Sequence, residues 1–564
     1  MVRTLPELLQ QRAQGERRDW DVRILHAAAD APPGFVAGGS DQSLALGYSE
    51  LWELACRAAF GLARGGVSAG DPVLLLLPTS ASFLAVFFGC QLLGAVPVPL
   101  VPPWSQRKQA HGERVSRVAS VCQARVAVTE ERYLPALSDA GLSLLLGQEL
   151  LQAEEPWRGP LPTRADAPAF IQFTSGSTSE PRGVVVEHGA ALANCRFIAE
   201  SVELGADDVG CSWLPLFHDM GLIGHLLVPL FGRTRSVLMP PEAFMLQPRV
   251  WLEAVSRYRA SISAAPNFAY DLCAQRMAQR DLAELDLSSW RVAMCGGETV
   301  RAETLKRFAA CFAGCGFEAA SFRPVYGLAE ATLAVTIPPR REQPLRELID
   351  RSQLEETGCA VPAAPDSAAI AITALGRVDP AHELRITGPD GQARGEREVG
   401  QIEVRGPAVM KRYYRDEGAT AAALEDGWLR TGDLGYLHGG DLFVTGRAKE
   451  IIVKAGRNVY PYDVEIAAER AAGVRAGRCA AFGAPNPATG TEDLVLVCET
   501  RVQGAEPRQQ LIKEILTSVF AATGLRPDAV HLLPPRSLSR TSSGKIQRAL
   551  VRTRFLGGEL RGDP

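Results

Sequence analysis

The chain has 564 residues, more than one hydrophobic core usually supports, so at least two domains are expected. Its hydrophobic residues (46%) and charged residues (22%) are in globular proportions, and a net charge of −4 gives no support for nucleic acid or an anionic membrane as main partner. The twelve cysteines form no C-x-x-C pair and no Cys/His cluster typical of zinc, and Met1 to Gln10 is no secretory leader. We therefore expect a cytoplasmic protein with free thiols and no integral membrane segment.

Strands alternate with helices through most of the chain. Asp71 to Leu77 is a short apolar strand, Ser82 to Leu93 an apolar helix, and Ala95 to Leu100 the next strand. Near-continuous apolar strands separated by helices indicate parallel sheets covered by helices. The same strand pattern returns at Val209 to Leu214, Ser236 to Met239 and Arg291 to Cys295.

The character of the chain changes after a turn-rich region at Gly388 to Gly400. Beyond it the sequence is rich in strands (QIEVRG, LFVTG, EIIVKAG), and the last hundred or so residues read as a compact α+β unit. We place a domain boundary near Gly446 to Glu450. The predicted domains are residues 1–446 and residues 447–564.

The stretch from Phe173 to His188 reads FTSGSTSEPRGVVVEH, a run of small and hydroxylic residues before an apolar strand. Its hydroxyls and N–H groups are suited to cradle phosphates, although Ser, Thr and Gly also build ordinary surface turns. It is not a P-loop, since the sequence G-x-x-x-x-G-K-[ST] does not occur. The nearest match, around Lys545, has Ser539 in place of the first Gly and Ile546 after the Lys.

Three further motifs carry groups suited to a nucleotide. Tyr326 offers an aromatic face for a base, and Glu330, four residues on, offers a carboxylate for Mg²⁺; a helix start with a surface Glu is the alternative. Asp433 follows a turn-like R-T-G and is placed to accept hydrogen bonds from ribose hydroxyls. Lys545 lies in a Ser/Gly-rich loop before an amphipathic helix, where a solvated surface lysine is the default.

The order of these motifs is more informative than any one of them. TSGST…PRG, HDMG, GGE, YGLAE, TGD, GR-x-K-[DE] and SSGK follow one another as in the adenylate-forming superfamily of acyl-CoA synthetases, adenylation domains and luciferases, which this chain resembles over nearly its whole length. The resemblance implies an α/β fold: a large N-terminal domain of parallel-rich sheets covered by helices, and a small mobile α+β C-terminal domain hinged near Lys449. It also implies that ATP, with Mg²⁺, and a carboxylic acid give an acyl-adenylate and pyrophosphate.

Within that superfamily the chain looks most like the fatty acyl-AMP ligases, which pass the acyl group to a carrier protein. An extra segment from Arg340 to about Ser367 lies where those ligases resemble one another in carrying an insertion; a variable surface loop is the alternative. Arg182 stands where many relatives have Lys, and it keeps the positive charge toward phosphate. The other stretches that carry the likeness are SWLPLFHDMGLIG (212–224), APNFAYDLC (265–273), VYGLAEATLAV (325–335) and GRNVYPYDVE (456–465).

The resemblance assigns roles residue by residue. The implied catalytic residues are Lys545, which bridges carboxylate and α-phosphate, Glu330 and His218; for His218 a purely structural role is an equal alternative. Glu330 and Thr178 would hold Mg²⁺. Residues at the junction of the acyl pocket would be Asp219, Met220 and Asn267. ATP and AMP would contact Thr174, Ser175, Gly176, Ser177, Thr178, Gly297, Glu298, Tyr326, Gly327, Asp433 and Arg447.

Four functions compete at this point. The first is a fatty acyl-AMP ligase that feeds a phosphopantetheinylated carrier protein of a polyketide or nonribosomal peptide pathway, and the second is a fatty acyl-CoA synthetase. The third, an amino-acid adenylation domain, is disfavoured because the region where such domains offer an Asp to the substrate ammonium is aromatic and aliphatic here. The fourth, a non-catalytic binding module, is disfavoured by the joint presence of Glu330, Asp433, Arg447 and Lys545.

The extra segment bears on the choice of acceptor. Leu345, Leu348, Ile349 and Leu354 are spaced almost as on a helix, which predicts that the segment docks on the large domain near the hinge. Docking there would disfavour the domain pose that coenzyme A needs. We therefore predict ready formation of acyl-AMP, poor transfer to free coenzyme A and good transfer to a carrier protein.

Overall fold

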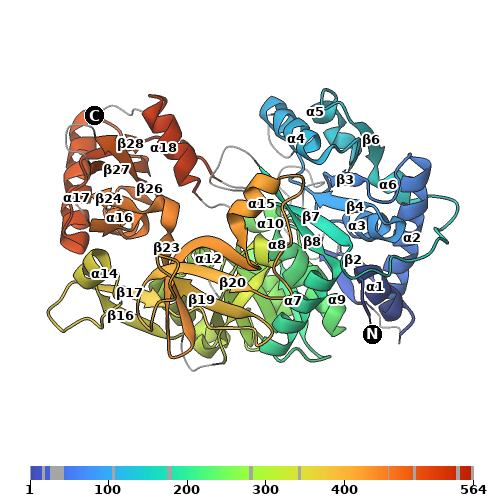
Figure 1. Cartoon of the computed structure of the whole chain (residues 1–564), viewed down its shortest axis with the longest axis horizontal. Coiled ribbons are helices and arrows are strands. Elements are labelled where there is room, and N and C mark those ends of the chain that lie inside the picture. The colour runs from blue at the N-terminus through green and yellow to red at the C-terminus, as the bar shows by residue number, and fades with distance from the viewer. Residues whose placement is uncertain are drawn as a thin grey trace.

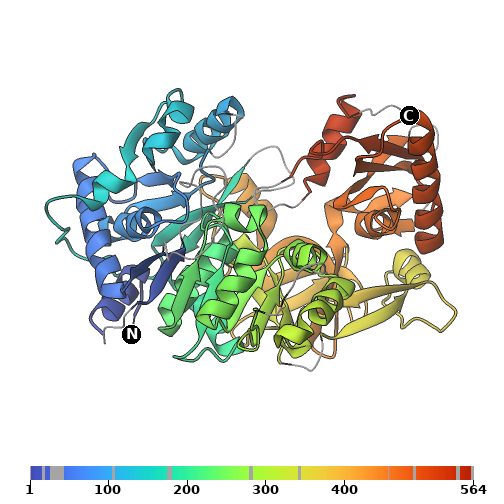
Figure 2. The same ribbon diagram turned by 180° about the vertical axis from the view of Figure 1, so that it is seen from behind.

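The computed structural model describes residues 2–15, 20–25, 43–103, 108–174, 181–277, 282, 284–340, 344–454, 457–486, 491–540 and 546–560. Figure 1 shows two bodies standing on a shared base: the sheet of β3–β6 with its helices on one side, and the unit that contains the C-terminus on the other. The chain end labelled N lies far from the chain end labelled C in both views (Figures 1 and 2).

The central sheet has seven strands, and all but its last pair are parallel. In spatial order they are β13 (Phe322–Pro324), β12 (Val292–Cys295), β11 (Ile262–Ala265), β9 (Val209–Ser212), β10 (Arg235–Leu238), β1 (Val22–Leu25) and β2 (Ser43–Leu46). Only β2 runs antiparallel to its neighbour. Parallel strands need helical crossovers, and buried aromatic side chains such as Trp251 and Phe308 fill the space between these helices and the sheet.

A second parallel sheet has four strands, in the order β4 (Val96–Pro99), β3 (Pro72–Leu75), β5 (Val126–Thr129) and β6 (Ser143–Leu146). Alternate residues of β3 serve different cores, as the period of two in a strand requires: Val73 and Leu75 face one cluster of buried residues, and Leu74 faces another. The helix predicted after this strand is α3 (Ala81–Leu93), and Ser82 to Leu92 are buried, as expected for a helix that is apolar on all sides.

Residues 1–446 contain further helices, which lie around these sheets and beside the strands that follow them. They are α1 (Leu5–Ala13), α2 (Tyr48–Arg64), α4 (Lys108–Cys122), α5 (Leu134–Leu137), α6 (Gly147–Leu151), α7 (His188–Ser201), α8 (Asp219–Leu222), a π-helix (Ile223–Leu227), α9 (Val228–Gly232), α10 (Pro241–Leu246), α11 (Arg249–Tyr258), α12 (Asn267–Met277), α13 (Ala302–Phe312), α14 (Arg351–Thr357) and α15 (Glu417–Ala423).

Antiparallel strands surround the point where these sheets meet. β7 (Pro168–Thr174) and β8 (Arg182–Glu187) form a hairpin-like pair, and β14 (Tyr326–Gly327), β15 (Ala334–Ile337) and β18 (Arg377–Val378) form a small sheet. A five-stranded sheet consists of β19 (Glu383–Thr387), β20 (Gly400–Arg405), β21 (Leu424–Glu425), β22 (Trp428–His438) and β23 (Asp441–Arg447). The mixed α/β architecture predicted from the sequence is confirmed.

The extra segment differs from its prediction. Leu348 and Ile349 belong to a strand, β16 (Arg346–Asp350), and Leu345 lies just before it. This strand pairs with β17 (Ala369–Thr373). Of the four residues only Leu354 is helical, in α14. The expected helical spacing was therefore wrong for the first three residues. A strand sends alternate side chains to opposite faces, so Leu348 is 53% exposed whereas Ile349 is fully buried beside Tyr436 and Phe443.

The C-terminal residues build their own sheet and cores. β26 (Val474–Asn486), β27 (Thr491–Thr500) and β28 (Ala529–Leu533) form a three-stranded sheet, preceded by the pair β24 (Ile452–Lys454) and β25 (Arg457–Val459). Cys479 and Ala481 face a cluster with α16 (Pro461–Ala468) and α17 (Ala505–Thr523), whereas Ala480 and Phe482 face α18 (Arg548–Leu556). The domain boundary near 446–450 stays a prediction, as does its hinge at Lys449, an exposed residue of a short 3₁₀ turn.

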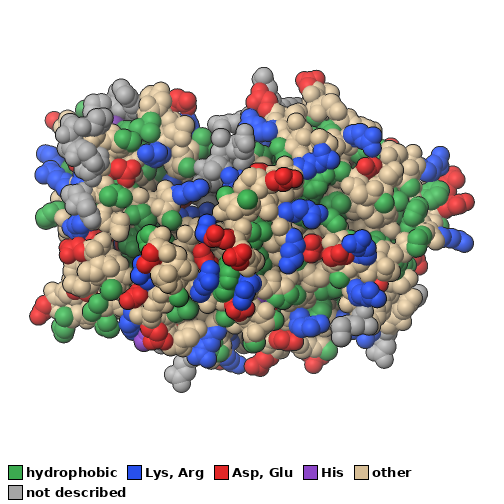
Figure 3. Space-filling model, in the orientation of Figure 1, with side chains coloured by type: hydrophobic (Ala, Val, Ile, Leu, Met, Phe, Trp, Pro, Cys, Tyr) green, Lys and Arg blue, Asp and Glu red, His purple; other side chains and the backbone are tan. Residues whose placement is uncertain are grey.

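The described surface carries charges of both signs. Figure 3 shows Lys and Arg side chains interspersed with Asp and Glu over one face, in keeping with the small net charge. None of the helices in the described ranges has the length and apolar character needed to cross a membrane. The cytoplasmic location stays a prediction.

Candidate active site

A cavity of about 1170 Å³ opens between the large lobe and the C-terminal unit. Most of the residues that the sequence singled out line it: Thr174, His218, Asp219, Met220, Asn267, Gly297, Glu298, Tyr326, Gly327, Glu330, Asp433 and Arg447. Ser175, Gly176, Ser177, Thr178 and Lys545 lie outside the described residues. Residues from six different motifs, up to 273 positions apart (Thr174 to Arg447), therefore share one space.

Tyr326, Asp433 and Arg447 form a hydrogen-bonded group on one wall of the cavity. The Tyr326 hydroxyl donates to Asp433 Oδ2 (2.7 Å), and Arg447 Nε donates to Asp433 Oδ1 (2.9 Å). Burial, together with the Asp433 carboxylate, raises the pKa of the Tyr326 hydroxyl, which therefore stays protonated and donates. The Asp433 carboxylate likewise raises the pKa of the Arg447 guanidinium. The group holds a negative carboxylate rigidly at the cavity wall.

Asp433 owes its direction to an irregularity in β22. Gln401 pairs with Leu434 and Glu403 pairs with Arg430, so residues 431–433 of β22 lie opposite a single residue of β20. Gly432 within this bulge has φ +76°, a conformation that favours glycine. The sequence placed Asp433 just after a turn, and this was wrong: it lies inside an eleven-residue strand, where the bulge turns its side chain into the cavity.

Glu330 is held on a neighbouring wall by a residue not expected from the sequence. The Tyr413 hydroxyl donates to Glu330 Oε1 (2.8 Å), and the Arg182 guanidinium lies 5.7 Å from the centre of the Tyr413 ring. Burial raises the pKa of the Glu330 carboxyl above its usual range, against the opposing effect of the Tyr413 hydrogen bond. Tyr413 occurs in the sequence KRYYRD, which resembles no site motif, so only the fold reveals it.

His218 and Asp219 lie at the start of α8, which begins beside the cavity. His218 Nδ1 is 2.5 Å from Asp219 Oδ1, and the Met220 N–H also points to Asp219 Oδ1 (2.7 Å). The pairing with Asp219 orients the imidazole, and both side chains are largely buried. The arrangement suits either of the two roles that the sequence left open for His218.

Two of the predicted residues, Glu298 and Asn267, accept hydrogen bonds from backbone N–H groups near the starts of helices. Glu298 Oε1 accepts from the Phe268 N–H (2.7 Å) at the start of α12, and Asn267 Oδ1 accepts from the Arg301 N–H (2.9 Å) before α13. Gly297 has φ +77°, which glycine adopts without strain. These contacts fix the starts of α12 and α13 at the cavity wall, where Glu298 and Arg301 are among the lining residues.

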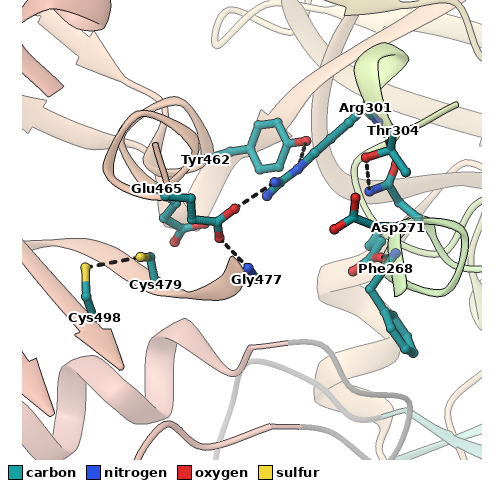
Figure 4. Close-up of polar contacts among 12 residues, drawn as sticks. Phe268, Asp271, Arg301, Thr304, Tyr462, Glu465, Gly477, Cys479 and Cys498 are labelled. Carbon is teal, nitrogen blue, oxygen red and sulfur yellow. Dashed lines mark hydrogen bonds and ion pairs between the residues drawn. The ribbon is translucent and has the colours of Figure 1, made fainter. Parts of the chain in front are cut away.

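The C-terminal unit closes the cavity through ion pairs with the large lobe. Figure 4 shows the Arg301 side chain reaching to Tyr462, whose hydroxyl accepts from Arg301 Nε (2.8 Å). Arg301 Nη1 also pairs with Glu469 Oε2 (2.8 Å) on the segment that ends α16. Within the C-terminal unit Arg548, just after the region of Lys545, binds Glu465 (2.7 Å) and Glu450 (2.9 Å).

Part of the cavity wall, the apolar branch, is made of apolar side chains. They include Ile198 and Val202 of the α7 region, Val228 of α9 and Ile262 of β11. Such an apolar branch fits a hydrocarbon chain, whereas the polar wall described above fits a phosphate ester of a nucleoside. In the part of the chain that the structure describes, no group of three His, Cys, Asp or Glu side chains is placed to hold a metal ion by itself.

Comparison with known proteins agrees with this geometry. The family model described as AMP-binding enzyme matches residues 25–414. A putative acyl-CoA synthetase of Caulobacter vibrioides is 36% identical over 91% of each chain, and the medium-chain-fatty-acid–[acyl-carrier-protein] ligase JamA of Moorena producens is 33% identical over 95% of this chain and 94% of its own. A solved structure from work on fatty acyl-adenylate ligases of E. coli and L. pneumophila superposes with a TM-score of 0.90, at 34% identity, over 99% of this chain and 98% of the other.

Proposed function

This chain belongs to the AMP-binding enzyme family, and we propose that it joins a fatty acid to AMP and then passes the acyl group to a phosphopantetheinylated carrier protein. It is an adenylate-forming ligase, as its relatives are by name. The observation that carries the proposal is the single cavity that combines the Tyr326–Asp433–Arg447 wall with an apolar branch.

The first step joins the two substrates. An oxygen of the fatty acid carboxylate attacks the α-phosphorus of ATP; the new P–O bond forms as the bond to the bridging oxygen breaks, and pyrophosphate leaves. Negative charge spreads over the α-phosphate in the transition state, so the enzyme acts by positioning and by cations. Lys545 is the proposed cation between carboxylate and phosphate, and Asp433 is the proposed acceptor for the ribose hydroxyls, while Arg447 holds Asp433 in place.

ATP substrates usually carry Mg²⁺, and the residues at the cavity fit such an ion. Mg²⁺ on a nucleotide keeps several waters and takes one or two carboxylates from the protein. Glu330, a buried carboxylate whose Oε1 is already oriented by Tyr413, is suited to this, with Thr178 as the second proposed ligand. The ion would neutralise charge on the leaving phosphates.

The second step transfers the acyl group to a thiol. The thiol sulfur attacks the acyl carbonyl, the C–O bond to AMP breaks, and a thioester and AMP result while the thiol proton is lost. The extra segment of residues 340–367 supports a carrier protein as acceptor. Its helix α14 joins the large lobe to the C-terminal unit: Arg351 Nη1 pairs with Asp463 Oδ2 of α16 (3.0 Å), and Glu355 pairs with Arg457 of β25.

These ion pairs favour the observed pose of the C-terminal unit. Glu355 and Asp463 are buried, and removing one partner of a buried pair leaves a costly unpaired charge. A bias of about 3 kcal/mol between poses suppresses the minor one by more than a hundredfold. Free coenzyme A, which requires a second pose, would therefore be a poor acceptor.

A fatty acyl-CoA synthetase remains the second candidate, since the Caulobacter vibrioides relative is named as one. Both candidates share the first step, and the acceptor separates them. Purified enzyme is given ATP, a series of fatty acids and either coenzyme A or a phosphopantetheinylated carrier protein, and pyrophosphate, acyl-AMP and thioester are measured. We expect acyl-AMP with thioester on the carrier; efficient acyl-CoA formation would favour the synthetase, and no pyrophosphate release would refute both.

A further inference from the structure

A short segment of the large lobe crosses between two parts of the candidate site, the strand that follows the proposed phosphate loop and the turn that carries Glu330. This crossing segment, residues 408–414, is held on one side by the Met410 N–H, which donates to the Glu330 carbonyl oxygen (2.8 Å). On the other side the Tyr414 N–H donates to the Gly183 carbonyl oxygen of β8 (2.7 Å). The crossing segment therefore fixes the position of β8 relative to Glu330.

Tyr413 is a residue of this segment that contacts both parts. Its backbone forms an antiparallel bridge with Val184 of β8, and only 5% of the residue is exposed. Its hydroxyl donates to Glu330 Oε1 (2.8 Å), and the centre of its ring lies 5.7 Å from the guanidinium carbon of Arg182, within the range of a cation–π contact. One side chain thus contacts a carboxylate with its polar end and a cation with its ring face.

The contact with Tyr413 leaves one oxygen of Glu330 for a ligand. The hydroxyl takes Oε1, no side chain of the described residues donates to Oε2, and Glu330 lines the cavity. A carboxylate can bind a divalent cation through one oxygen while a hydrogen bond to the other oxygen orients it, and such outer partners affect metal affinity strongly. The Tyr413 hydroxyl therefore fixes the direction of the oxygen that is left for Mg²⁺.

Arg182 lies on the phosphate side of this arrangement. It is the first residue of β8 and pairs in register with Thr174, the last described residue before the phosphate loop, which lines the cavity. A planar guanidinium stacks on an aromatic ring, whereas a lysine ammonium is a compact and strongly hydrated charge. The contact with the Tyr413 ring therefore depends on an arginine and not only on a positive charge.

We propose that Tyr413 is a positioning residue that links Arg182 to Glu330, so that the nucleotide phosphates and Mg²⁺ bind this enzyme cooperatively. The inference rests on the proposed function and deepens it, because it names the side chain through which two parts of the ATP site act together. When phosphates engage Arg182, the Tyr413 ring against it is held in place, and its hydroxyl keeps Glu330 oriented. The coupling is reciprocal, so Mg²⁺ strengthens nucleotide binding by the same factor.

The test measures this coupling without turnover. Titration calorimetry on the intact enzyme gives the dissociation constant of α,β-methylene-ATP, an analogue that cannot release pyrophosphate, once with EDTA and once with saturating Mg²⁺. The ratio of the two constants is the coupling factor. Tyr413→Phe keeps the ring and removes the hydroxyl, so the coupling factor should fall about tenfold, as expected for a hydrogen bond to a charged group, while the constant in EDTA changes by less than about twofold.

Three further variants locate the effect. Glu330→Gln removes the charge on which the hydroxyl acts, so its double variant with Tyr413→Phe should have the coupling factor of Glu330→Gln alone. Arg182→Lys keeps the charge and should lower the factor in the parent but not in the Tyr413→Phe background. Tyr414→Phe is the matched control and should leave the factor unchanged, because among the described residues the Tyr414 ring contacts Arg415 and its hydroxyl has no hydrogen bond.

The outcomes separate this proposal from the proposed function. A coupling factor in Tyr413→Phe equal to that of the parent overturns the role of Tyr413, and so do losses that simply add in the double variant or an equal loss in Tyr414→Phe. If Tyr413→Phe does not fold, an unchanged factor in Arg182→Lys overturns it. If the parent binds the analogue and Mg²⁺ cooperatively but releases no pyrophosphate with any fatty acid, the proposed adenylation of fatty acids fails while the role of Tyr413 stands. A parent that does not bind the analogue overturns both.

Discussion

At the scale of single residues, Lys545 carries the strongest kinetic prediction. Lys545→Ala should slow acyl-AMP formation by about a hundredfold or more, because a positioned cation is lost from the transition state. Far-UV circular dichroism should be unchanged, since the Ser/Gly-rich sequence around Lys545 predicts a solvated side chain and such a lysine adds little stability. The rate is measured by pyrophosphate release at saturating ATP, with Lys513→Ala, a lysine of α17, as the matched control. Acyl-AMP formation at the parent rate would remove Lys545 from the mechanism.

Asp433 has a prediction of its own. Asp433→Ala removes the acceptor proposed for ribose and leaves Arg447 and Tyr326 without their common partner. A charged hydrogen bond contributes roughly 1.5–3 kcal/mol, so kcat/KM for ATP should fall by more than about tenfold. The parent enzyme should use 2′-deoxy-ATP poorly, and the variant should discriminate less between the two nucleotides. Equal use of both nucleotides by the parent would contradict the assignment.

His188 provides a prediction on pH and stability. It is buried at the start of α7, where Nδ1 accepts from the Leu5 N–H, and burial lowers its pKa from the ordinary 6.5 to about 4. The unfolded chain therefore binds more protons between these values, and the free energy of unfolding falls as the pH is lowered from 6.5 toward 4, by about 3 kcal/mol from this residue.

The measurement follows tryptophan emission during denaturation, because all eight tryptophans precede residue 446. His188→Asn retains an acceptor for Leu5 and should show a flatter dependence of the midpoint on pH, although its midpoint at pH 7 is lower. A parent midpoint that does not change between pH 6.5 and pH 4.5 would show that His188 titrates normally.

The residues of the candidate site could be predicted where a motif identifies them. They could not be predicted where the fold brings a hydrogen-bond partner from a distant segment. Tyr326, Glu330 and Asp433 follow from the order of motifs, and they line one cavity. Tyr413 comes from a segment with no recognisable pattern, and Tyr462 lies in the GRNVYPYDVE stretch but received no role from it. Nothing in the sequence brings Tyr413 within hydrogen-bond distance of Glu330. Long-range pairs of this kind depend on how two sheets pack, which local patterns do not encode.

At the scale of elements, α14 is the contact to test. Arg351→Met removes the cation between Glu355 and Asp463 and keeps the length of the side chain. The contact between α14 and α16 should weaken, so acyl-CoA formation should rise at least tenfold while pyrophosphate release stays near the parent rate. Arg394→Met, which removes a half-exposed Arg394–Asp390 pair, is the control. An unchanged ratio of acyl-CoA to acyl-AMP would show that α14 does not restrain the C-terminal unit.

Elements were predicted well where burial is one-sided or complete. The apolar runs at β3 and α3 appear almost as expected, because a run bounded by Gly or Pro leaves little choice of structure. The extra segment was misread because Leu345, Leu348 and Ile349 satisfy a helical spacing while their environment, pairing with β17, selects a strand. Short apolar runs leave helix and strand undecided, and tertiary pairing decides between them.

At the scale of the whole molecule, the cores of the C-terminal unit are separate from that of the large lobe. The clusters of buried residues on the two faces of β26–β28 share no member with the main cluster, and among the described clusters only the one around Ile349 and Tyr436 reaches across, through Tyr460. Damage to one core should therefore remain local.

Ile515→Ala tests this separation. Ile515 of α17 is fully buried in the cluster that α17 shares with α16, β26 and β27, and its truncation should destabilise the C-terminal unit by about 2–5 kcal/mol. Hydrogen–deuterium exchange should quicken in β26–β28 while the denaturation midpoint reported by tryptophan emission stays within experimental error of the parent. If the denaturation midpoint falls together with the exchange protection of β26–β28, the two parts unfold as one.

Separate cores have a consequence for how such chains change over generations. When two parts share few buried contacts, the effects of substitutions in one part add to those in the other rather than depend on them. A recombination event between β23 and β24 would cut across no main core and would leave both sets of interior contacts complete. Among the described residues, the cluster that reaches across through Tyr460 and the contacts at α14 and Arg301 would need to be re-matched, so this short stretch is where two parental genes could be joined with few contacts to restore.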